Sequence, residues 1–168
     1  MSAPNRLARV VAKFDVLPKP LRSRAITLFM GRMVPYVWTS DVRIELLTPD
    51  RCVASIPNHR QVRNHIGGIH AAAMALLAET ATGFVVAMNV PDTHVPVIKT
   101  LHVDYKKRLQ GALRVEAWLT EDQRERIRTE DKGDVSVHVR ATDQAGQEPI
   151  ACEMTWAWIP KQRRPAQA

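Results

Sequence analysis

A stretch of 26 residues, from Ile66 to Pro91, contains a single formally charged side chain, Glu79. Residues 66–88 are long enough to cross a membrane, but seven of them are alanines of low hydrophobicity, and His70 and two threonines interrupt the run. We therefore expect no transmembrane segment here. The stretch predicts one long helix that is buried on nearly all sides, with small side chains that let a sheet approach closely.

Alternating apolar and polar residues before and after this helix predict β-strands. The predicted strands cover residues 42–46, 52–56, 97–107, 112–120, 134–142 and 149–159. We expect a hairpin from the first two and a meander from the last four, because only turn residues and short polar runs, among them the charged run 121–133, separate them. One buried helix beside an antiparallel sheet of about six strands is an α+β fold.

Residues 1–35 precede this domain as a basic arm. They hold seven basic residues and one acid, and so carry six of the seven net positive charges. Helical spacing of apolar residues predicts two amphipathic helices, which we expect to pack on the domain. A membrane-surface helix and an organelle-targeting segment are the alternatives. The two predicted apolar faces comprise Leu7, Val10, Val11 and Phe14, and Leu21, Ala25, Leu28, Phe29 and Met33.

Composition narrows the class of protein. With 45% hydrophobic and 24% charged residues, the chain has the composition of a globular domain, expected at residues 36–160 and followed by a disordered tail at 161–168. Outside the arm, basic and acidic residues nearly balance, which argues against a nucleic-acid partner. Cys52 and Cys152 lack metal-ligand spacing, so we expect no zinc. Few cysteines and no secretory signal pattern predict a reducing compartment, the cytoplasm.

Glu79 is the first candidate for chemistry. Burying an unpaired carboxylate is unfavourable, so such a residue usually has a partner or a function. One interpretation places Glu79 at the helix surface or beside a distant arginine. The other places it in an apolar cleft with an altered pKa, where it would act as a general base or nucleophile.

The start of the predicted helix is the second candidate. The backbone amides of Ala71 and Ala72 lack partners within the helix there, and they could hold the oxyanion formed from a carbonyl group. Asn64, His65 and His70 lie beside them in the sequence. Their amide and imidazole groups could orient a carbonyl or a water molecule, or they could cap the helix and brace its loop.

The spacing between the two candidates favours a dimer. His70 and Glu79 are nine residues apart, which puts them on opposite helix faces and roughly 13 Å apart along the axis. A site that uses both therefore combines the helix start of one chain with Glu79 of another. A separate basic cluster, Lys106-Lys107-Arg108, ends a predicted strand and is either a solvated turn or a binding site for a phosphorylated group.

The run from Asn64 to Glu79 resembles the signature of hotdog-fold acyl-CoA thioesterases, in particular the group of the phenylacetate-pathway and 4-hydroxybenzoyl-CoA enzymes. That signature has an amide residue six positions before a His-Gly-Gly and an acidic residue nine positions after the histidine. Asn64, His70 and Glu79 match it in type and spacing. The resemblance covers about residues 36–160.

The resemblance implies a central helix wrapped by an antiparallel sheet, dimers or tetramers with sites between subunits, and hydrolysis of acyl-CoA or acyl-carrier-protein thioesters without a metal or redox cofactor. Glu79 would be the base or nucleophile and the Ala71 amide the oxyanion donor, while Asn64 would orient substrate or water and His70 would complete the catalytic set. The candidate substrate-binding residues are His65, Gly68, Ala72 and Thr82, together with the basic cluster Lys106, Lys107 and Arg108.

Two departures from the signature qualify this interpretation. Ala71 and Ala72 replace the two glycines, which keeps the amides but adds methyl groups and predicts a narrower or displaced acyl pocket. The threonine expected four residues after the acid is Gly83, with Thr82 beside it. A protein with this fold that binds acyl-CoA without hydrolysing it therefore stays open as an alternative.

Overall fold

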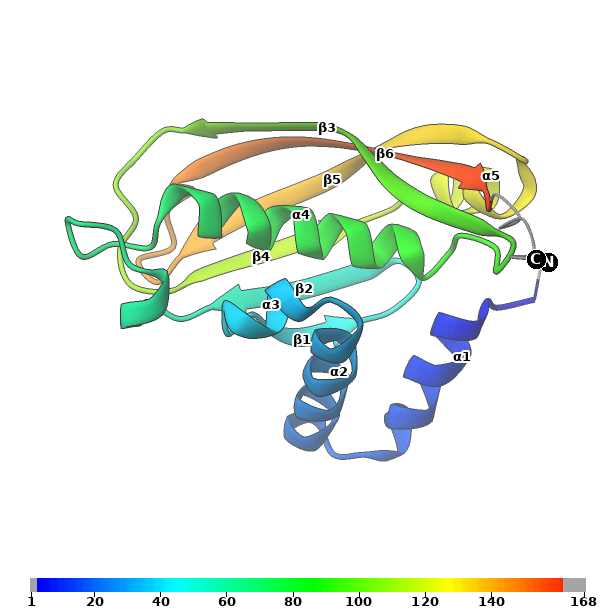
Figure 1. Cartoon of the computed structure of the whole chain (residues 1–168), viewed down its shortest axis with the longest axis horizontal. Helices are drawn as coiled ribbons and strands as arrows, with labels where there is room; N and C mark the ends of the chain where they lie inside the picture. The colour runs from blue at the N-terminus through cyan, green and yellow to red at the C-terminus, as the bar shows by residue number, and fades with distance from the viewer. Residues whose placement is uncertain (1–2, 162–168) are drawn as a thin grey trace, which may run out of the picture.

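The computed structural model describes residues 3–161, so most of the predicted tail lies outside the described residues. One six-stranded antiparallel sheet carries α4 (Ala71–Ala87) across one of its faces (Figure 1). This α+β arrangement is the predicted one. The strands are β1 (Arg43–Leu47), β2 (Arg51–Ile56), β3 (His94–Tyr105), β4 (Leu113–Trp118), β5 (Gly133–Asp143) and β6 (Ile150–Pro160).

The central helix α4 begins later than the predicted 66–88. The chain turns at Gly67, whose φ of 78° suits glycine, and His70 caps the helix because its Nδ1 accepts a hydrogen bond from the Ala72 amide at 3.1 Å. Small residues let the sheet approach as expected: a Cβ on Gly83 would lie 2.7 Å from the Trp156 ring. Residues fully buried along α4 include Leu77, Ala78, Ala81, Thr82, Val85 and Val86.

The strand order is β1-β2-β4-β5-β6-β3, so the predicted four-strand meander is wrong for its first strand. The β1–β2 hairpin and the β4-β5-β6 meander form as expected. β3 instead lies at the far edge of the sheet, where it pairs with β6 from His94 opposite Pro160 to Tyr105 opposite Ile150. The segment after β3 crosses the end of the sheet to reach β4.

The charged run after β4, predicted as a turn, contains the helix α5 (Glu121–Thr129). Its start is a capping box, in which Thr120 Oγ1 accepts from the Gln123 amide and the Gln123 side chain accepts from the Thr120 amide. Ile127 is its one fully buried residue among charged neighbours.

The N-terminal segment folds into α1 (Arg6–Ala12), the 3₁₀ helix η1 (Lys13–Val16), α2 (Lys19–Met33) and α3 (Pro35–Thr39). Outside this segment, a second 3₁₀ helix, η2 (Arg60–Val62), lies between β2 and α4. α2 packs beside β1, and its most deeply buried side chains, Ile26 and Met30, lie outside the predicted face. Phe29 of the predicted face packs, partly buried, against the core. Its Thr27 and Ser23 side chains bond the backbone N–H and C=O of Ile44 at 2.8 and 2.7 Å. The predicted face is in error at Leu21, Leu28 and Met33, which are 50–54% exposed.

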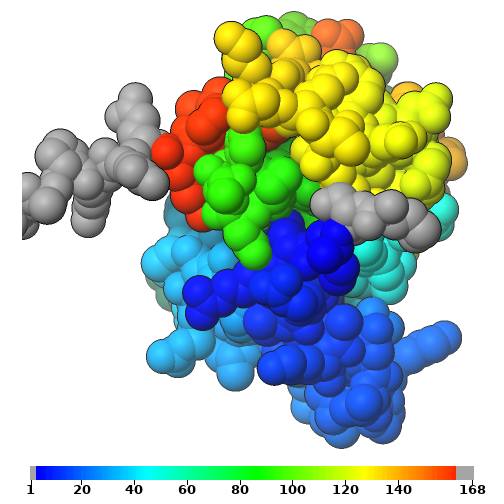
Figure 2. All heavy atoms as spheres, turned by 90° about the vertical axis from the view of Figure 1, so that its right-hand side faces the viewer, coloured from blue at the N-terminus to red at the C-terminus, as the bar shows by residue number. Residues whose placement is uncertain are grey.

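Asn5 fastens α1 to the end of α4. Its Oδ1 accepts from the Ala8 amide, which caps α1, and its Nδ2 donates to the carbonyl oxygens of Ala87 and Val90 at 2.8 and 2.6 Å. In the space-filling view the blue N-terminal helices lie against the green segment at the end of α4 (Figure 2). The segment is thus part of the folded body.

No helix among the described residues has the length and apolar character needed to cross a membrane.

Candidate active site

A cavity of about 240 Å³ opens beside the middle of α4, between this helix and the N-terminal helices. Glu79 is the one charged residue among the described residues that line it, and Thr80 is next to it. The ten other lining residues are apolar and come from the N-terminal segment, α4, β3 and β6. The sequence therefore placed Glu79 in the correct kind of environment, an apolar cleft.

Burial raises the pKa of Glu79 above that of an ordinary glutamate, and the neighbouring Thr80 hydroxyl opposes this rise. Thr80 itself is 2% exposed, and its Oγ1 forms no hydrogen bond of normal distance and angle with any described residue. Thr80 could not be singled out from the sequence, because a threonine in a helix is common. The site thus holds a carboxylate that is easily protonated and a hydroxyl that can still donate.

The start of α4 offers one backbone donor. The Ala72 amide is already bound to His70 Nδ1, which places the proton of a neutral His70 ring on Nε2. The Ala71 amide has no acceptor within residues 3–161 and is exposed. Tyr105, which the sequence did not single out, donates its hydroxyl to the Ala71 carbonyl at 2.8 Å and so ties β3 to this helix end.

Asn64 holds the loop in front of α4. Its Oδ1 accepts from the amides of Ile66 and Gly68, both at 3.1 Å, and its Nδ2 donates to the Ile69 carbonyl at 3.4 Å. Asn64 thus shapes the path of the chain into the helix start. His65 is exposed on the same loop.

The basic cluster lies beside this loop. Arg108 donates to the Ile66 carbonyl at 3.4 Å, and the backbone amides of Lys106 and Lys107 share the Pro149 carbonyl. All three basic side chains are exposed. The cluster therefore places exposed positive charge beside the loop that leads into α4.

Thr82 is fully buried, away from the cavity lining. Its hydroxyl donates to carbonyl oxygens of the preceding turn and accepts from Trp156 Nε1 at 3.0 Å. These partners occupy the hydroxyl and fix the indole of Trp156, so Thr82 supports the cavity wall without lining the cavity itself.

The candidate residues thus lie in two groups along α4. One contains Glu79, Thr80 and the cavity, and the other contains the helix start, its loop and the basic cluster. Nine residues of helix, roughly 13 Å, separate His70 from Glu79 within one chain. Among the described residues, no three histidine, cysteine, aspartate or glutamate side chains gather as a possible metal site.

A family model described as a domain of unknown function, DUF4442, matches residues 22–159. The chain belongs to the DUF4442 family. The match begins inside α2 and ends inside β6, so it includes Glu79 and the whole sheet but not α1. None of the curated proteins matches the sequence significantly.

Solved structures resemble this DUF4442 protein. PA5026 of Pseudomonas aeruginosa, a protein of unknown function described as a probable thioesterase, has a TM-score of 0.73 at 25% identity over 86% of this chain and 97% of its own. A putative thioesterase from Shewanella oneidensis has a TM-score of 0.69 at 13% identity, over 82% of this chain and 97% of its own. Thioesterase HI1161 from Haemophilus influenzae has a TM-score of 0.62 at 12% identity, over 78% of this chain and 88% of its own. The last two likenesses show the fold alone, and the predicted hotdog fold is confirmed.

Proposed function

We propose that this DUF4442 protein hydrolyses thioesters of acyl-CoA or of an acyl carrier protein, with Glu79 as general base or nucleophile. The observation that carries the proposal is the place of Glu79 as the charged residue among the described residues of a largely apolar cavity, where burial raises its pKa. A carboxylate with a raised pKa holds a proton more strongly than an ordinary glutamate, which suits it to act as a general base. The likeness to the probable thioesterase of Pseudomonas aeruginosa supports the same class of reaction.

In the general-base route, Glu79 removes a proton from water as the water oxygen bonds to the thioester carbonyl carbon. The carbonyl oxygen becomes an oxyanion, which the Ala71 amide stabilises by donating a hydrogen bond. Collapse of this intermediate breaks the carbon–sulfur bond, and the thiolate receives the proton from Glu79. In the nucleophilic route, the carboxylate attacks the same carbon, expels the thiolate and forms an anhydride that water then hydrolyses.

Both routes need Glu79 and Ala71 at one carbonyl group, and one chain holds them at separate places along α4. We therefore include a homodimer in the proposal, with the helix start and basic cluster of one chain facing Glu79 of its partner, and pairing of dimers into a tetramer as a further step. A symmetric dimer contains two such sites. The exposed cluster Lys106-Lys107-Arg108 would attract the phosphates of CoA.

One observation favours a second function, binding of acyl-CoA without hydrolysis. The Ala72 amide is bound to His70, which leaves the Ala71 amide as the free backbone donor at this helix start within the described residues. Fewer donors stabilise an oxyanion less well. The cavity would still hold an acyl group.

Thiol release across a panel of acyl-CoA thioesters tests the proposal, with Glu79→Gln as the variant and Glu125→Gln as the control. Glu125 lies exposed on α5, so its substitution removes the same charge away from the cavity. Glu79→Gln should fold and lose about 10²-fold in kcat, as expected for removal of a general base, while Glu125→Gln keeps full activity. Near-normal turnover by Glu79→Gln would contradict the catalytic role. Binding of acyl-CoA by a wild-type protein that releases no thiol would support the second function.

A further inference from the structure

We infer that the N-terminal helices form one wall of the acyl-group pocket and set the largest acyl group that the protein accepts. The inference rests on the proposed function, since it takes the ligand to be an acyl thioester. Five of the twelve residues around the cavity precede β1 in the sequence. These residues are Leu7, Met30, Met33, Val34 and Val37.

The chemistry of the cavity suits an apolar group with one polar end. Phe84, Pro96 and Trp156 line it together with the N-terminal residues, and an apolar lining favours hydrocarbon over water. Polar side chains occur at one place, Glu79 and Thr80. The buried Thr80 hydroxyl forms no hydrogen bond of normal geometry with the described residues, so a ligand with a hydrogen-bond acceptor beside it would be stabilised there. A thioester carbonyl followed by an alkyl or aryl group has this pattern.

The volume limits the size of the group. An apolar cavity of ~150 Å³ holds one benzene molecule, so about 240 Å³ holds, in proportion, roughly ten carbon atoms. This matches a single aromatic ring with its carboxyl carbon, or an aliphatic acyl group of medium length. Met33 is 54% exposed at the rim, so a longer chain must pass it or displace it.

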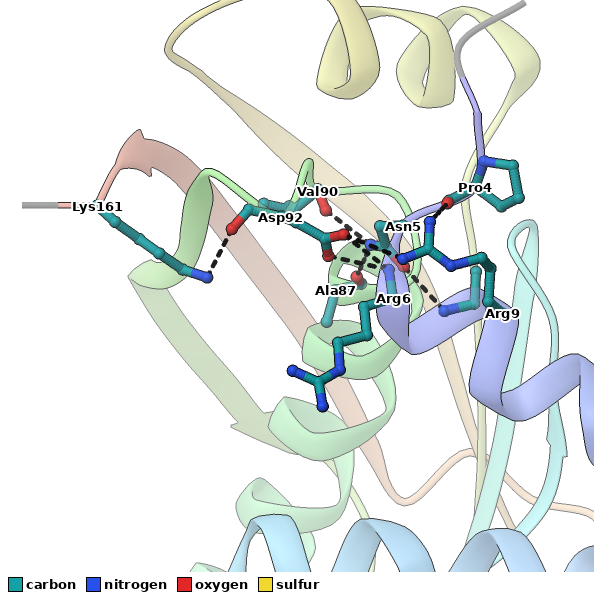
Figure 3. A network of polar contacts seen from close by, with 9 residues as sticks. Pro4, Asn5, Arg6, Arg9, Ala87, Val90, Asp92 and Lys161 are labelled. Carbon is teal, nitrogen blue, oxygen red and sulfur yellow. Dashed lines mark hydrogen bonds and ion pairs between the residues drawn. The ribbon is translucent and has the colours of Figure 1, made fainter.

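The wall is fastened to the helix that carries Glu79. Asn5 bonds the end of α4, as described above, and the Arg6 amide donates to both carboxylate oxygens of Asp92 at 2.9 and 3.1 Å (Figure 3). Leu7, the next residue, lines the cavity. Hydrogen bonds at both ends of this wall, from Asn5 to the end of α4 and from α2 to β1, attach it to the rest of the fold. An attached wall can select acyl groups by size.

The test substitutes Met33 at the rim and compares it with Leu21 on the same helix. Leu21 is 51% exposed, close to the 54% of Met33, and does not line the cavity. Hydrolysis should be measured with butanoyl-, octanoyl-, decanoyl- and hexadecanoyl-CoA. Binding should be measured by calorimetry with S-decyl-CoA, a thioether that cannot be hydrolysed, and with CoA alone.

We expect the wild-type protein to prefer octanoyl- and decanoyl-CoA over hexadecanoyl-CoA. Met33→Trp should lower kcat/KM for decanoyl-CoA and weaken S-decyl-CoA binding by about tenfold or more, because the larger side chain keeps part of the ten-carbon chain out of the pocket and so removes its apolar contacts. The same variant should leave kcat/KM for butanoyl-CoA and the affinity for CoA unchanged. Met33→Ala should raise the relative rate with hexadecanoyl-CoA. Leu21→Trp should change neither property.

The outcomes separate this inference from the proposed function. An unchanged chain-length profile and unchanged S-decyl-CoA binding in both Met33 variants would overturn the inference, while hydrolysis by the wild type would leave the proposed function standing. An equal effect of Leu21→Trp would also overturn it. Binding of S-decyl-CoA that depends on Met33, in a protein that hydrolyses no thioester, would support the pocket and contradict the hydrolysis.

Discussion

Burial of Glu79 raises its pKa, which makes the stability of the folded protein depend on pH in a definite direction. The folded state holds the proton more tightly than the unfolded state, where a glutamate titrates at about 4.3. Stability from this group is fully present below the unfolded pKa and is lost as the pH rises through the higher folded pKa. Glu79→Gln removes the titration, so the variant should gain free energy of unfolding relative to wild type as the pH rises above the unfolded pKa.

Urea unfolding at a series of pH values measures this difference, with Glu125→Gln as the exposed control. The gap between wild type and Glu79→Gln should widen with rising pH in favour of the variant, while the gap for Glu125→Gln should change less. Parallel stability curves for wild type and Glu79→Gln would show that the pKa of Glu79 is the same in both states.

The environment of a single residue could be predicted where that residue differs in type from all its neighbours in the sequence. Glu79 is the lone charge in a long apolar run, and the structure places it in an apolar cavity. Thr80 and Tyr105 carry no such mark, because their importance comes from what tertiary folding places around them. Asn64 has the predicted spacing, but its side-chain bonds to the loop are visible only once the turn at Gly67 is known.

At the scale of elements, the sequence predicts strands well and their order poorly. Alternation is local, so all six strands lie close to their predicted positions, whereas the pairing of β3 with β6 joins segments about fifty residues apart. The predicted face of α2 is right at Phe29 and wrong at Leu21 and Leu28, because apolar residues occur on two sides of the helix and tertiary packing decides which of them are buried. α5 was missed because only Ile127 is buried, although the Thr120–Gln123 capping box was a readable signal.

The segment after β3 carries the next prediction. Lys106 and Lys107 are exposed near the α4 start, and two exposed charge contacts of ~0.5 kcal/mol each would change affinity by roughly fivefold. The double variant Lys106→Ala/Lys107→Ala should therefore raise KM for acyl-CoA by about this factor at low salt and by less at high salt, with little effect on kcat. Steady-state kinetics at two ionic strengths measure both parameters.

A matched control removes the same charge elsewhere. Arg24 and Lys132 are exposed on α2 and after α5. The double variant Arg24→Ala/Lys132→Ala should leave KM unchanged, because a local phosphate contact depends on where the charges lie and not on the net charge. Equal effects in the two double variants would indicate that the net charge of the protein attracts the substrate. An unchanged KM at low salt in Lys106→Ala/Lys107→Ala would show that these lysines belong to a solvated turn and bind no phosphate.

At the scale of the whole molecule, the two edge strands of the sheet, β1 and β3, differ. Side chains of α2 bond the backbone of β1 at Ile44, whereas β3 has no second strand beside it among the described residues. β3 runs for twelve residues, pairs on one side with β6, and exposes apolar side chains among which Leu101 is 48% exposed. A long exposed edge strand is a surface on which another strand can add, and proteins usually cover it. Pairing of β3 with β3 of a second copy would cover the edge and bring two α4 helices to one side of a joined sheet, as the shared site requires.

Leu101→Lys tests this assembly, because a lysine on the edge strand adds two like charges across a symmetric interface and opposes strand addition. Light scattering at micromolar concentration should give twice the mass of the chain, or a multiple of it, for wild type and the mass of one chain for Leu101→Lys. Thioester hydrolysis should fall together with the mass, because each site takes Ala71 from one subunit and Glu79 from the other. Leu28→Lys, a change of the same kind at a residue 50% exposed on α2, should alter neither. A wild-type monomer with full activity would contradict the dimer and would require one chain to act with Glu79 alone.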